Sequence, residues 1–336
     1  MEKKKLLITG GLGFIGVNTA TFLNNAGYQI VLIDNFYRKE SFNNRQIINS
    51  HKEIEVSEMS ILDSEGITEL IKKNNFYAVL NFAGQVAMTN SIQDPYNDFL
   101  INTVGNFNLL ESIRKHSPET LFLYTSSNKV YGDLKWDNLE EKLLRYESIK
   151  NKYGYNTEIP IELKSPYGCS KGASDFYTID YKNTFGLNTL VLRLSTIYGQ
   201  NQFSTYNQGW IGWFIKEFFN KNNLEISGNG KQVRDILHVN DFSNLIYLII
   251  ENFSAAKESV YNVGGGYTNS ISLLELFEIL SLKFNFIPKV TKLNERISDQ
   301  RYYVSNLNNL ERDFSWVPQI GKLNGIDSYS DWIAGN

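Results

Sequence analysis

The feature that most constrains the fold is the alternation of short apolar segments with longer segments of helical periodicity. Six short segments predict strands: Leu6–Thr9, Ile30–Asp34, Ile54–Val56, Ala78–Gly84, Leu121–Ser127 and Thr189–Ser195. Several are apolar without alternation, as strands covered on both faces are. Helical patterns lie between them, at Phe14–Asn25, Glu65–Lys73, Pro95–His116 and Pro166–Thr184. This order predicts an α/β fold with a doubly wound parallel sheet.

The pattern changes after Gly199, where longer helices such as Gln208–Lys221 alternate with short strands and loops. A chain of 336 residues exceeds the usual size of one hydrophobic core. We therefore expect two domains. The first comprises residues 1–198, with about 236–252 packed back on it, and the second is a smaller mixed α/β domain of residues 199–235 and 253–336.

The charge balance and the cysteine count argue against several classes of protein. Lysine and arginine number 33 against 36 acidic residues, which gives a net charge of −3 and no general basic surface for nucleic acid or a membrane. No apolar run approaches the roughly 20 residues that span a bilayer, and glycines interrupt the apolar start, so we expect no signal peptide. The one cysteine, Cys169, cannot form an internal disulfide, and three histidines are too few for a histidine-rich metal site. We expect a cytoplasmic protein without a metal, in which Cys169 packs.

The segment TGGLGFIG, residues 9–16, follows a predicted strand and opens a predicted helix. Its glycines at 10, 13 and 16 permit a tight turn and let a pyrophosphate approach the helix N-terminus, whose free N–H groups favour anions. Asp34 ends the second predicted strand, where a carboxylate binds both ribose hydroxyls and repels a 2′-phosphate. The combination predicts a Rossmann-type site for NAD rather than NADP, a preference that Arg38 nearby weakens.

The segment SPYGCSKG, residues 165–172, places Tyr167 four residues before Lys171. Positions i and i+4 share one face of a helix, so the phenol and the ammonium would be neighbours. A neighbouring lysine favours the phenolate, which makes tyrosine usable as a base. Ser165 as N-cap and Pro166 in the first turn give this helix a credible start. Taken alone, such a pair is more often a chance surface pair.

The segment TSSNKVYG, residues 125–132, lies at the carboxyl end of a predicted strand, where open α/β sheets bind ligands. Ser127 or Ser126 could therefore face a substrate hydroxyl over a nicotinamide, although serines that cap loops are common. A dinucleotide site, a serine at a strand end and a tyrosine–lysine pair together indicate an oxidoreductase-type site.

These features resemble the extended short-chain dehydrogenase/reductases, the NAD-dependent epimerases and dehydratases that modify nucleotide sugars. The resemblance covers essentially the whole chain. Its more specific stretches are AGQVAMTNSI (83–92), SSNKVYGDL (126–134), SPYGCSKGASD (165–175), TYNQGWIGWF (205–214), ISGNGKQVRDILH (226–238) and SDQR (298–301). They are similar to the 2-epimerases that act on CDP-linked dideoxyhexoses.

The resemblance implies catalytic roles for three residues. Tyr167 would be the acid/base, Lys171 would lower its pKa and bind the nicotinamide ribose, and Ser127 would hydrogen-bond the reacting oxygen. The implied NAD-binding residues are Gly10, Gly13, Phe14, Ile15, Gly16, Asp34, Asn35, Arg38, Ala83, Gly84 and Lys171. The adenine contact that relatives make with an aspartate falls on Ser60, which puts that one contact in doubt.

The same resemblance implies a site for a nucleotide sugar, with a CDP-sugar as the expected substrate. The implied substrate-binding residues are Gln85, Ser127, Asn128, Tyr167, Asn207, Gln208, Arg234, Arg296 and Asp299. The two arginines would bind the diphosphate, because guanidinium groups contact phosphate oxygens bidentately, and Asp299 would bind the nucleotide ribose. The alternative for Arg234 is an internal ion pair with Asp235. We expect Trp210, Trp213, Phe214 and His238 to be packing residues.

Three functions remain open: a nucleotide-sugar epimerase, a 4,6-dehydratase and a non-catalytic NAD-binding protein. Dehydratases of this type carry an Asp-Glu pair directly after the strand-end serine or threonine, where this chain has Asn128 and Lys129. The intact set of Ser127, Tyr167 and Lys171 argues against a non-catalytic protein, although it does not separate inversion at C2 from inversion at C4. Relatives pair through two helices, so we expect a homodimer or homotetramer that uses the helices predicted at 95–116 and 166–184.

Overall fold

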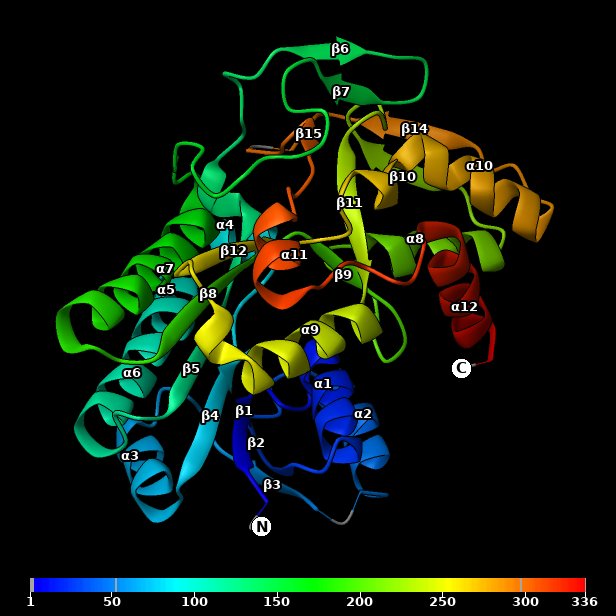
Figure 1. Ribbon diagram of the computed structural model, residues 1–336. Coiled ribbons are helices and arrows are strands. Elements are labelled where there is room, and N and C mark those ends of the chain that lie inside the picture. The colour runs from blue at the N-terminus through cyan, green and yellow to red at the C-terminus, as the bar shows by residue number, and fades with distance from the viewer. Residues whose placement is uncertain (1–2, 52, 297, 336) are drawn as a thin grey trace.

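The computed structural model describes residues 3–51, 53–296 and 298–335, and its centre is a parallel sheet (Figure 1). Within the described residues this sheet has seven strands in the order β12-β8-β5-β4-β1-β2-β3. Their bounds are β1 (Lys5–Thr9), β2 (Gln29–Asp34), β3 (Ile54–Glu58), β4 (Phe76–Asn81), β5 (Leu121–Ser127), β8 (Thr189–Leu194) and β12 (Val260–Val263). All six pairings are parallel. The predicted fold class and the six predicted strands are therefore confirmed.

Helices cover both faces of this sheet, which explains the apolar strands. The helices of this part are α1 (Phe14–Asn25), α2 (Glu40–Ile48), α3 (Ser64–Lys73), α4 (Met88–Gln93), α5 (Pro95–Phe99), α6 (Gly105–His116), α7 (Ser165–Phe185) and α9 (Val239–Glu251). Leu6 and Ile8 of β1 pack in one core with residues of α1 and α9. Leu7 between them packs in the opposite core with residues of α3, α6 and α7. Burying one such side chain stabilises the fold by about 1.5–3 kcal/mol.

Several features of the sheet domain differ from the sequence-based expectation, among them the helices α2 and α4, which were not predicted. The helix predicted for residues 95–116 is interrupted by a π-helical turn, Leu100–Val104, between α5 and α6. Asn102 of this turn donates hydrogen bonds to the backbone oxygen of Gln85 and to the hydroxyl of Ser170, contacts that helical periodicity does not reveal. The seventh strand, β12, was not predicted.

The remaining elements form the smaller domain and its connections. Their strands are β6 (Leu139–Glu141), β7 (Tyr146–Ser148), β9 (Thr196–Tyr198), β10 (Leu224–Ser227), β11 (Val233–His238), β13 (Ser270–Ser272), β14 (Val290–Leu293) and β15 (Tyr302–Tyr303). Their helices are α8 (Trp210–Phe219), α10 (Leu273–Phe284), α11 (Asn308–Phe314) and α12 (Lys322–Gly335), with 3-10 turns at Asn128–Tyr131, Phe253–Ala255 and Tyr267–Asn269. β11 is the central strand of this domain, because it pairs with β9, β13 and β15. Phe214 is buried in the core of this domain, with Trp210 and Trp213 packed against it, as expected.

The chain crosses between the two domains more often than the sequence suggested. Residues 260–263 form β12 of the main sheet, and Leu310 and Phe314 of α11 pack in the same core as α1 and α9. Both segments fall in the range 253–336, which the sequence assigned to the second domain. The other proposed boundaries stay a prediction.

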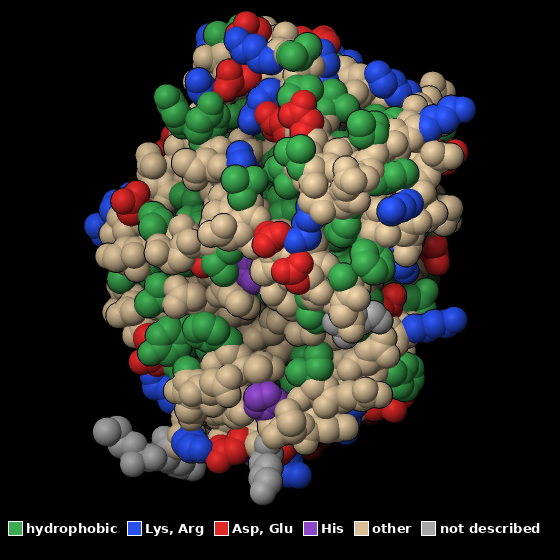
Figure 2. Space-filling model, turned by 90° about the vertical axis from the view of Figure 1, so that its right-hand side faces the viewer, with side chains coloured by type: hydrophobic (Ala, Val, Ile, Leu, Met, Phe, Trp, Pro, Cys, Tyr) green, Lys and Arg blue, Asp and Glu red, His purple; other side chains and the backbone are tan. Residues whose placement is uncertain are grey.

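The surface carries mixed charge. The face shown in Figure 2 has lysine and arginine side chains interspersed with aspartate and glutamate. Among the described residues, no helix is long and apolar enough to span a membrane. Cys169 is exposed on α7, so the expectation that it packs is wrong.

Candidate active site

The glycine turn between β1 and α1 is closely packed against the end of β4. Gly10 has φ +60°, and a Cβ there would lie 2.8 Å from the backbone of Ala83. A Cβ on Gly16 would lie 2.4 Å from the carbonyl oxygen of Gly10. Gly13 is the N-cap of α1, and Phe14 and Ile15 in its first turn are half-buried. A glycine-rich turn at a helix N-terminus fits a pyrophosphate.

Asp34 ends β2 beside this turn. Its carboxylate accepts hydrogen bonds from the N–H of Leu12 at 3.1 Å and of Phe36 at 2.9 Å, which fix its orientation. Asn35 is exposed, and its side-chain oxygen accepts from the N–H of Tyr37. A fixed carboxylate at this strand end fits the adenine ribose of NAD.

Arg38 joins the loop after β2 to the smaller domain. Its Nη1 donates a hydrogen bond of 2.9 Å to Oε1 of Gln208, in the loop before α8. Burial lowers the pKa of Arg38, and the charges of Glu40 and Asp34 oppose this shift. The two residues were predicted to bind cofactor and substrate, respectively, and the structure brings them into direct contact. Asn207, next to Gln208, is exposed.

Tyr167 and Lys171 lie in the first two turns of α7, and both are buried. The helix begins at Ser165 and its N-cap is Lys164, so the prediction of Ser165 as N-cap is wrong, although the Ser165 hydroxyl accepts the backbone N–H of Gly168. The Lys171 ammonium donates to the carbonyl oxygen of Thr125 at 2.8 Å. It also lies beside the segment after β4, since a Cβ on Gly84 would be 3.3 Å from Nζ. The Lys171 side chain therefore extends from α7 to the ends of β4 and β5, where it lies beside residues predicted to bind NAD.

The protonation of this pair depends on burial and on one buried acid. Burial raises the pKa of Tyr167 to about 12; a hydrogen bond with Ser127 and the charge of Arg38 act in the opposite direction, and Asp98 raises it further. Burial lowers the pKa of Lys171 to about 8, while the charges of Asp98 and Asp175 raise it. The structure thus places Ser127 on the Tyr167 phenol, and Asp98 within electrostatic range of both partners.

Ser127 and Ser126 point in different directions. The Ser126 hydroxyl donates to Asp175 at 2.9 Å, and Asp175 also forms a buried ion pair with Arg193 at 2.8 Å. The Ser127 hydroxyl instead donates to Oδ1 of Asn128 at 3.4 Å and accepts the N–H of Lys129 at 3.2 Å, and it is near enough to the Tyr167 phenol to lower the pKa of that phenol. Of the two serines that the sequence left open, Ser127 is the one beside the tyrosine.

Asp98 is a residue of the site that sequence reasoning missed. It is fully buried, and its carboxylate accepts hydrogen bonds from the Ser170 hydroxyl and from Nε2 of Gln85 at 2.9 Å. Gln85 also donates from Nε2 to the carbonyl oxygen of Ala87. From the sequence, an aspartate in a short helix is expected at the surface. Only the packing of α5 against α7 shows that Asp98 is buried in the site. Gln85, predicted to bind substrate, is thus bonded within the protein.

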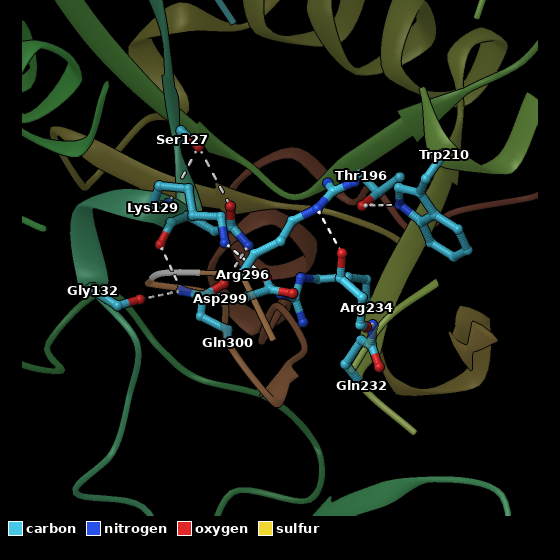
Figure 3. Close-up of polar contacts among 12 residues, drawn as sticks. Ser127, Lys129, Gly132, Thr196, Trp210, Gln232, Arg234, Arg296, Asp299 and Gln300 are labelled. Atoms are coloured by element: carbon cyan, nitrogen blue, oxygen red, sulfur yellow. Dashed lines mark hydrogen bonds and ion pairs between the residues drawn. The ribbon is translucent and has the colours of Figure 1, made fainter. Parts of the chain in front are cut away.

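A cluster of charged side chains lies where the smaller domain meets the end of β5 (Figure 3). Arg234 of β11 donates from Nη2 to Asp299 at 2.7 Å, and Lys129 donates to the same carboxylate oxygen at 3.2 Å. Arg296 is exposed, with its guanidinium 5.7 Å from the centre of the Tyr206 ring. Asp235, the alternative partner of Arg234, instead accepts from the N–H groups of Gly266 and Ser305. The three residues predicted for the nucleotide therefore lie together.

Asn128 links this cluster to the turn after β5, beside Ser127. Its Nδ2 donates to Oε1 of Gln300 at 3.1 Å, and Nε2 of Gln300 donates to the carbonyl oxygens of Asn128 and Gly132. Both residues are buried. The Asn128 side chain was predicted to bind substrate. It is instead hydrogen-bonded to Gln300, the residue after Asp299, and this bond helps to hold the segment that carries Asp299.

The comparisons with known proteins give the family. Residues 6–264 match the model of the NAD dependent epimerase/dehydratase family. The chain belongs to this family. It is 42% identical to the CDP-paratose 2-epimerase of Salmonella typhi, over 98% of this chain and 99% of that protein.

Solved structures of this family share the fold. The dTDP-glucose 4,6-dehydratase of Bacillus anthracis in complex with NAD has a TM-score of 0.82 at 25% identity, covering 99% of this chain and 97% of that one. The UDP-glucose 4-epimerase of Thermotoga maritima with UDP-glucose has a TM-score of 0.83 at 24% identity, covering 98% and 99%.

The chain is thus an NAD-dependent enzyme of the epimerase/dehydratase family, and its own geometry fits the cofactor. Glycines at 10 and 16 allow the tight turn at the N-terminus of α1, because a Cβ at either position would clash with backbone atoms, and Asp34 is oriented at the end of β2. Within the described residues, no group of histidine, cysteine and acidic side chains could hold a metal ion.

Proposed function

We propose that the protein is a nucleotide-sugar epimerase that inverts C2 of a CDP-linked dideoxyhexose, in the manner of CDP-paratose to CDP-tyvelose. The observation that carries this proposal is the 42% identity to a CDP-paratose 2-epimerase over 98% of the chain. It is supported by the grouping of Ser127, Tyr167 and Lys171 at the end of β5.

Each residue of the site has its own role in the proposed epimerisation. A carbinol hydrogen is not acidic, so inversion requires transient oxidation to a keto sugar. Tyr167 takes the hydroxyl proton and later returns it, and Ser127 orients the reacting oxygen. The glycine turn after β1, Asp34 and Lys171 would hold NAD, which when bound would supply the hydride acceptor for the oxidation and the hydride donor for the reduction on the other face. Arg234 and Arg296 hold the diphosphate while the sugar turns over between the two steps.

The 4,6-dehydratase is disfavoured by the two residues that follow Ser127. The Asn128 side chain is bonded to Gln300, and Lys129 is paired with Asp299. Neither position supplies the acid and base that an elimination requires. Inversion at C4 is the second candidate, because the UDP-glucose 4-epimerase of Thermotoga maritima shares the fold.

A panel of CDP-, UDP- and GDP-linked sugars assayed by NMR tests the proposal. We expect interconversion of a CDP-linked dideoxyhexose at C2. In deuterated water the product should carry no deuterium at the inverted carbon, since the hydride returns from the cofactor. Solvent deuterium at C2 would refute the hydride route, and inversion only at C4 would assign the protein to the second candidate.

We further propose a cytoplasmic homodimer or homotetramer. Aromatic side chains are exposed along α5, α6 and α7: Tyr96, Phe99, Phe107, Phe176, Tyr177 and Phe185. A second copy of the chain would cover such a stripe across a two-fold axis. Light scattering at micromolar concentration should give at least twice the monomer mass, and a monomer mass would refute the assembly.

A further inference from the structure

The charged cluster around Asp299 holds more positive charge than its own carboxylate neutralises. Lys129 and Arg234 both bond Oδ1 of Asp299, and Arg296 is close enough to affect the pKa of Lys129. Burial lowers the pKa of Lys129, the Asp299 carboxylate opposes this shift, and Arg234 and Arg296 add to it. Three cations around one carboxylate leave a net charge of +2 within this group. Such charges repel one another unless an anion joins them.

Lys129 also belongs to the catalytic turn. It follows Ser127 by two residues, and its backbone N–H bonds the Ser127 hydroxyl at 3.2 Å. Its side chain is only 18% exposed, and it extends from that turn to the cluster shown in Figure 3. Lys129 therefore connects the group that faces the reacting oxygen with the groups predicted to bind the diphosphate.

We propose that Lys129 is a substrate ligand, the third cation of the diphosphate subsite beside Arg234 and Arg296. This inference rests on the proposed function of the same site. In the free protein Asp299 holds the Lys129 ammonium; when a nucleoside diphosphate binds, the ammonium moves to a phosphate oxygen. Asp299 is then free for the nucleotide ribose. The net charge of the cluster matches a doubly negative diphosphate.

The position of Lys129 suits inversion at C2. The carbon that reacts in a 2-epimerase is bonded to the carbon that carries the diphosphate. The catalytic serine and the diphosphate ligands must then lie close together, and a lysine two residues after Ser127 meets that requirement. In a 4-epimerase the reacting carbon lies across the sugar ring, so a diphosphate ligand on the catalytic turn would have no such advantage.

The test is the substitution Lys129→Gln, with binding of CDP to the NAD-loaded protein measured by calorimetry. The substitution keeps the backbone N–H that bonds Ser127. We expect CDP affinity to fall about ten- to hundredfold, since a hydrogen bond to a charged group is lost. Lys135→Gln is the matched control, because Lys135 is six residues further along and 83% exposed, and its CDP affinity should stay within about twofold of wild type.

A second substitution separates direct contact from an indirect effect through Asp299. In an Asp299→Asn background, Lys129→Gln should still weaken CDP binding if the ammonium contacts phosphate. If the second substitution costs nothing further there, Lys129 acts only on Asp299 and the proposal is wrong. A wild-type protein that binds CDP but epimerises no CDP-sugar would refute the proposed function alone, because the effect of Lys129→Gln on CDP affinity would still be measured.

Discussion

Arg38 and Gln208 connect the two domains through one hydrogen bond of 2.9 Å between Nη1 and Oε1. Arg38 follows the strand whose end carries Asp34, and Gln208 precedes α8 of the smaller domain. The contact means that the loop beside the expected adenosine site is held partly by the domain expected to bind substrate. A residue predicted to bind the cofactor is thereby in direct contact with a residue predicted to bind the substrate.

Gln208→Ala should weaken NAD binding to the apo protein, although Gln208 lies in the smaller domain. Loss of the partner of this partly buried guanidinium costs about 1–3 kcal/mol. Part of this cost should appear as weaker NAD binding, so we expect NAD affinity to fall about three- to tenfold in a fluorescence titration. Lys39→Ala, next to Arg38 but exposed, is the control and should bind NAD normally. Unchanged NAD affinity in Gln208→Ala would show that the contact does not orient Arg38.

Tyr167→Phe should leave folding and NAD binding intact but reduce turnover about 10²- to 10⁴-fold or more, because the phenol hydroxyl exchanges the substrate proton. Tyr153→Phe, which removes the hydroxyl of an exposed tyrosine outside the site and outside the proposed subunit interface, is the control. Single-turnover NMR of a CDP-sugar measures the difference. Near-normal turnover in Tyr167→Phe would eliminate it as the acid/base.

NAD affinity of the apo protein should fall as pH rises through about 8, the pKa of Lys171. Below that pH the ammonium is charged and can donate to the nicotinamide ribose; above it the charge is lost. Because Asp98 raises this pKa, Asp98→Asn should move the decline to lower pH. Titration of NAD between pH 7 and 10 measures both midpoints. A profile in Lys171→Met that still declines with the wild-type midpoint would assign the decline to another group.

His238 should make the fold sensitive to mild acid. It is buried at the start of α9, where Nδ1 accepts the N–H of Asn240, and burial lowers its pKa from 6.5 to about 4. The unfolded chain therefore binds more protons between these pH values, and stability is lost as pH falls from about 6.5 to 4, by up to a few kcal/mol.

His238→Asn should remove most of this acid dependence while keeping an N-cap acceptor. Urea unfolding at pH 7 and pH 5 measures the difference for each protein. His116→Asn, which replaces an exposed histidine at the end of α6, is a control that should retain the wild-type dependence. An equal loss in His238→Asn would place the acid-sensitive group elsewhere.

The sequence by itself determined what depends on neighbours along the chain. Apolar runs located six strands, glycine spacing located the turn after β1, and the four-residue spacing of Tyr167 and Lys171 placed both in the first turns of one helix. These are short-range properties, since periodicity and backbone conformation are set within a few residues.

The tertiary structure decided which groups face one another. Lys171 bonds Thr125, 46 positions away, and Lys129 bonds Asp299, 170 positions away. The buried Asp98 influences both Tyr167 and Lys171 only because α5 packs on α7. β12 joins the sheet by pairing with β8, which no local pattern shows. The hydrogen-bond partner of a side chain and the pKa of an ionisable group depend on burial and on distances across the fold. Both are defined only once the chain has folded.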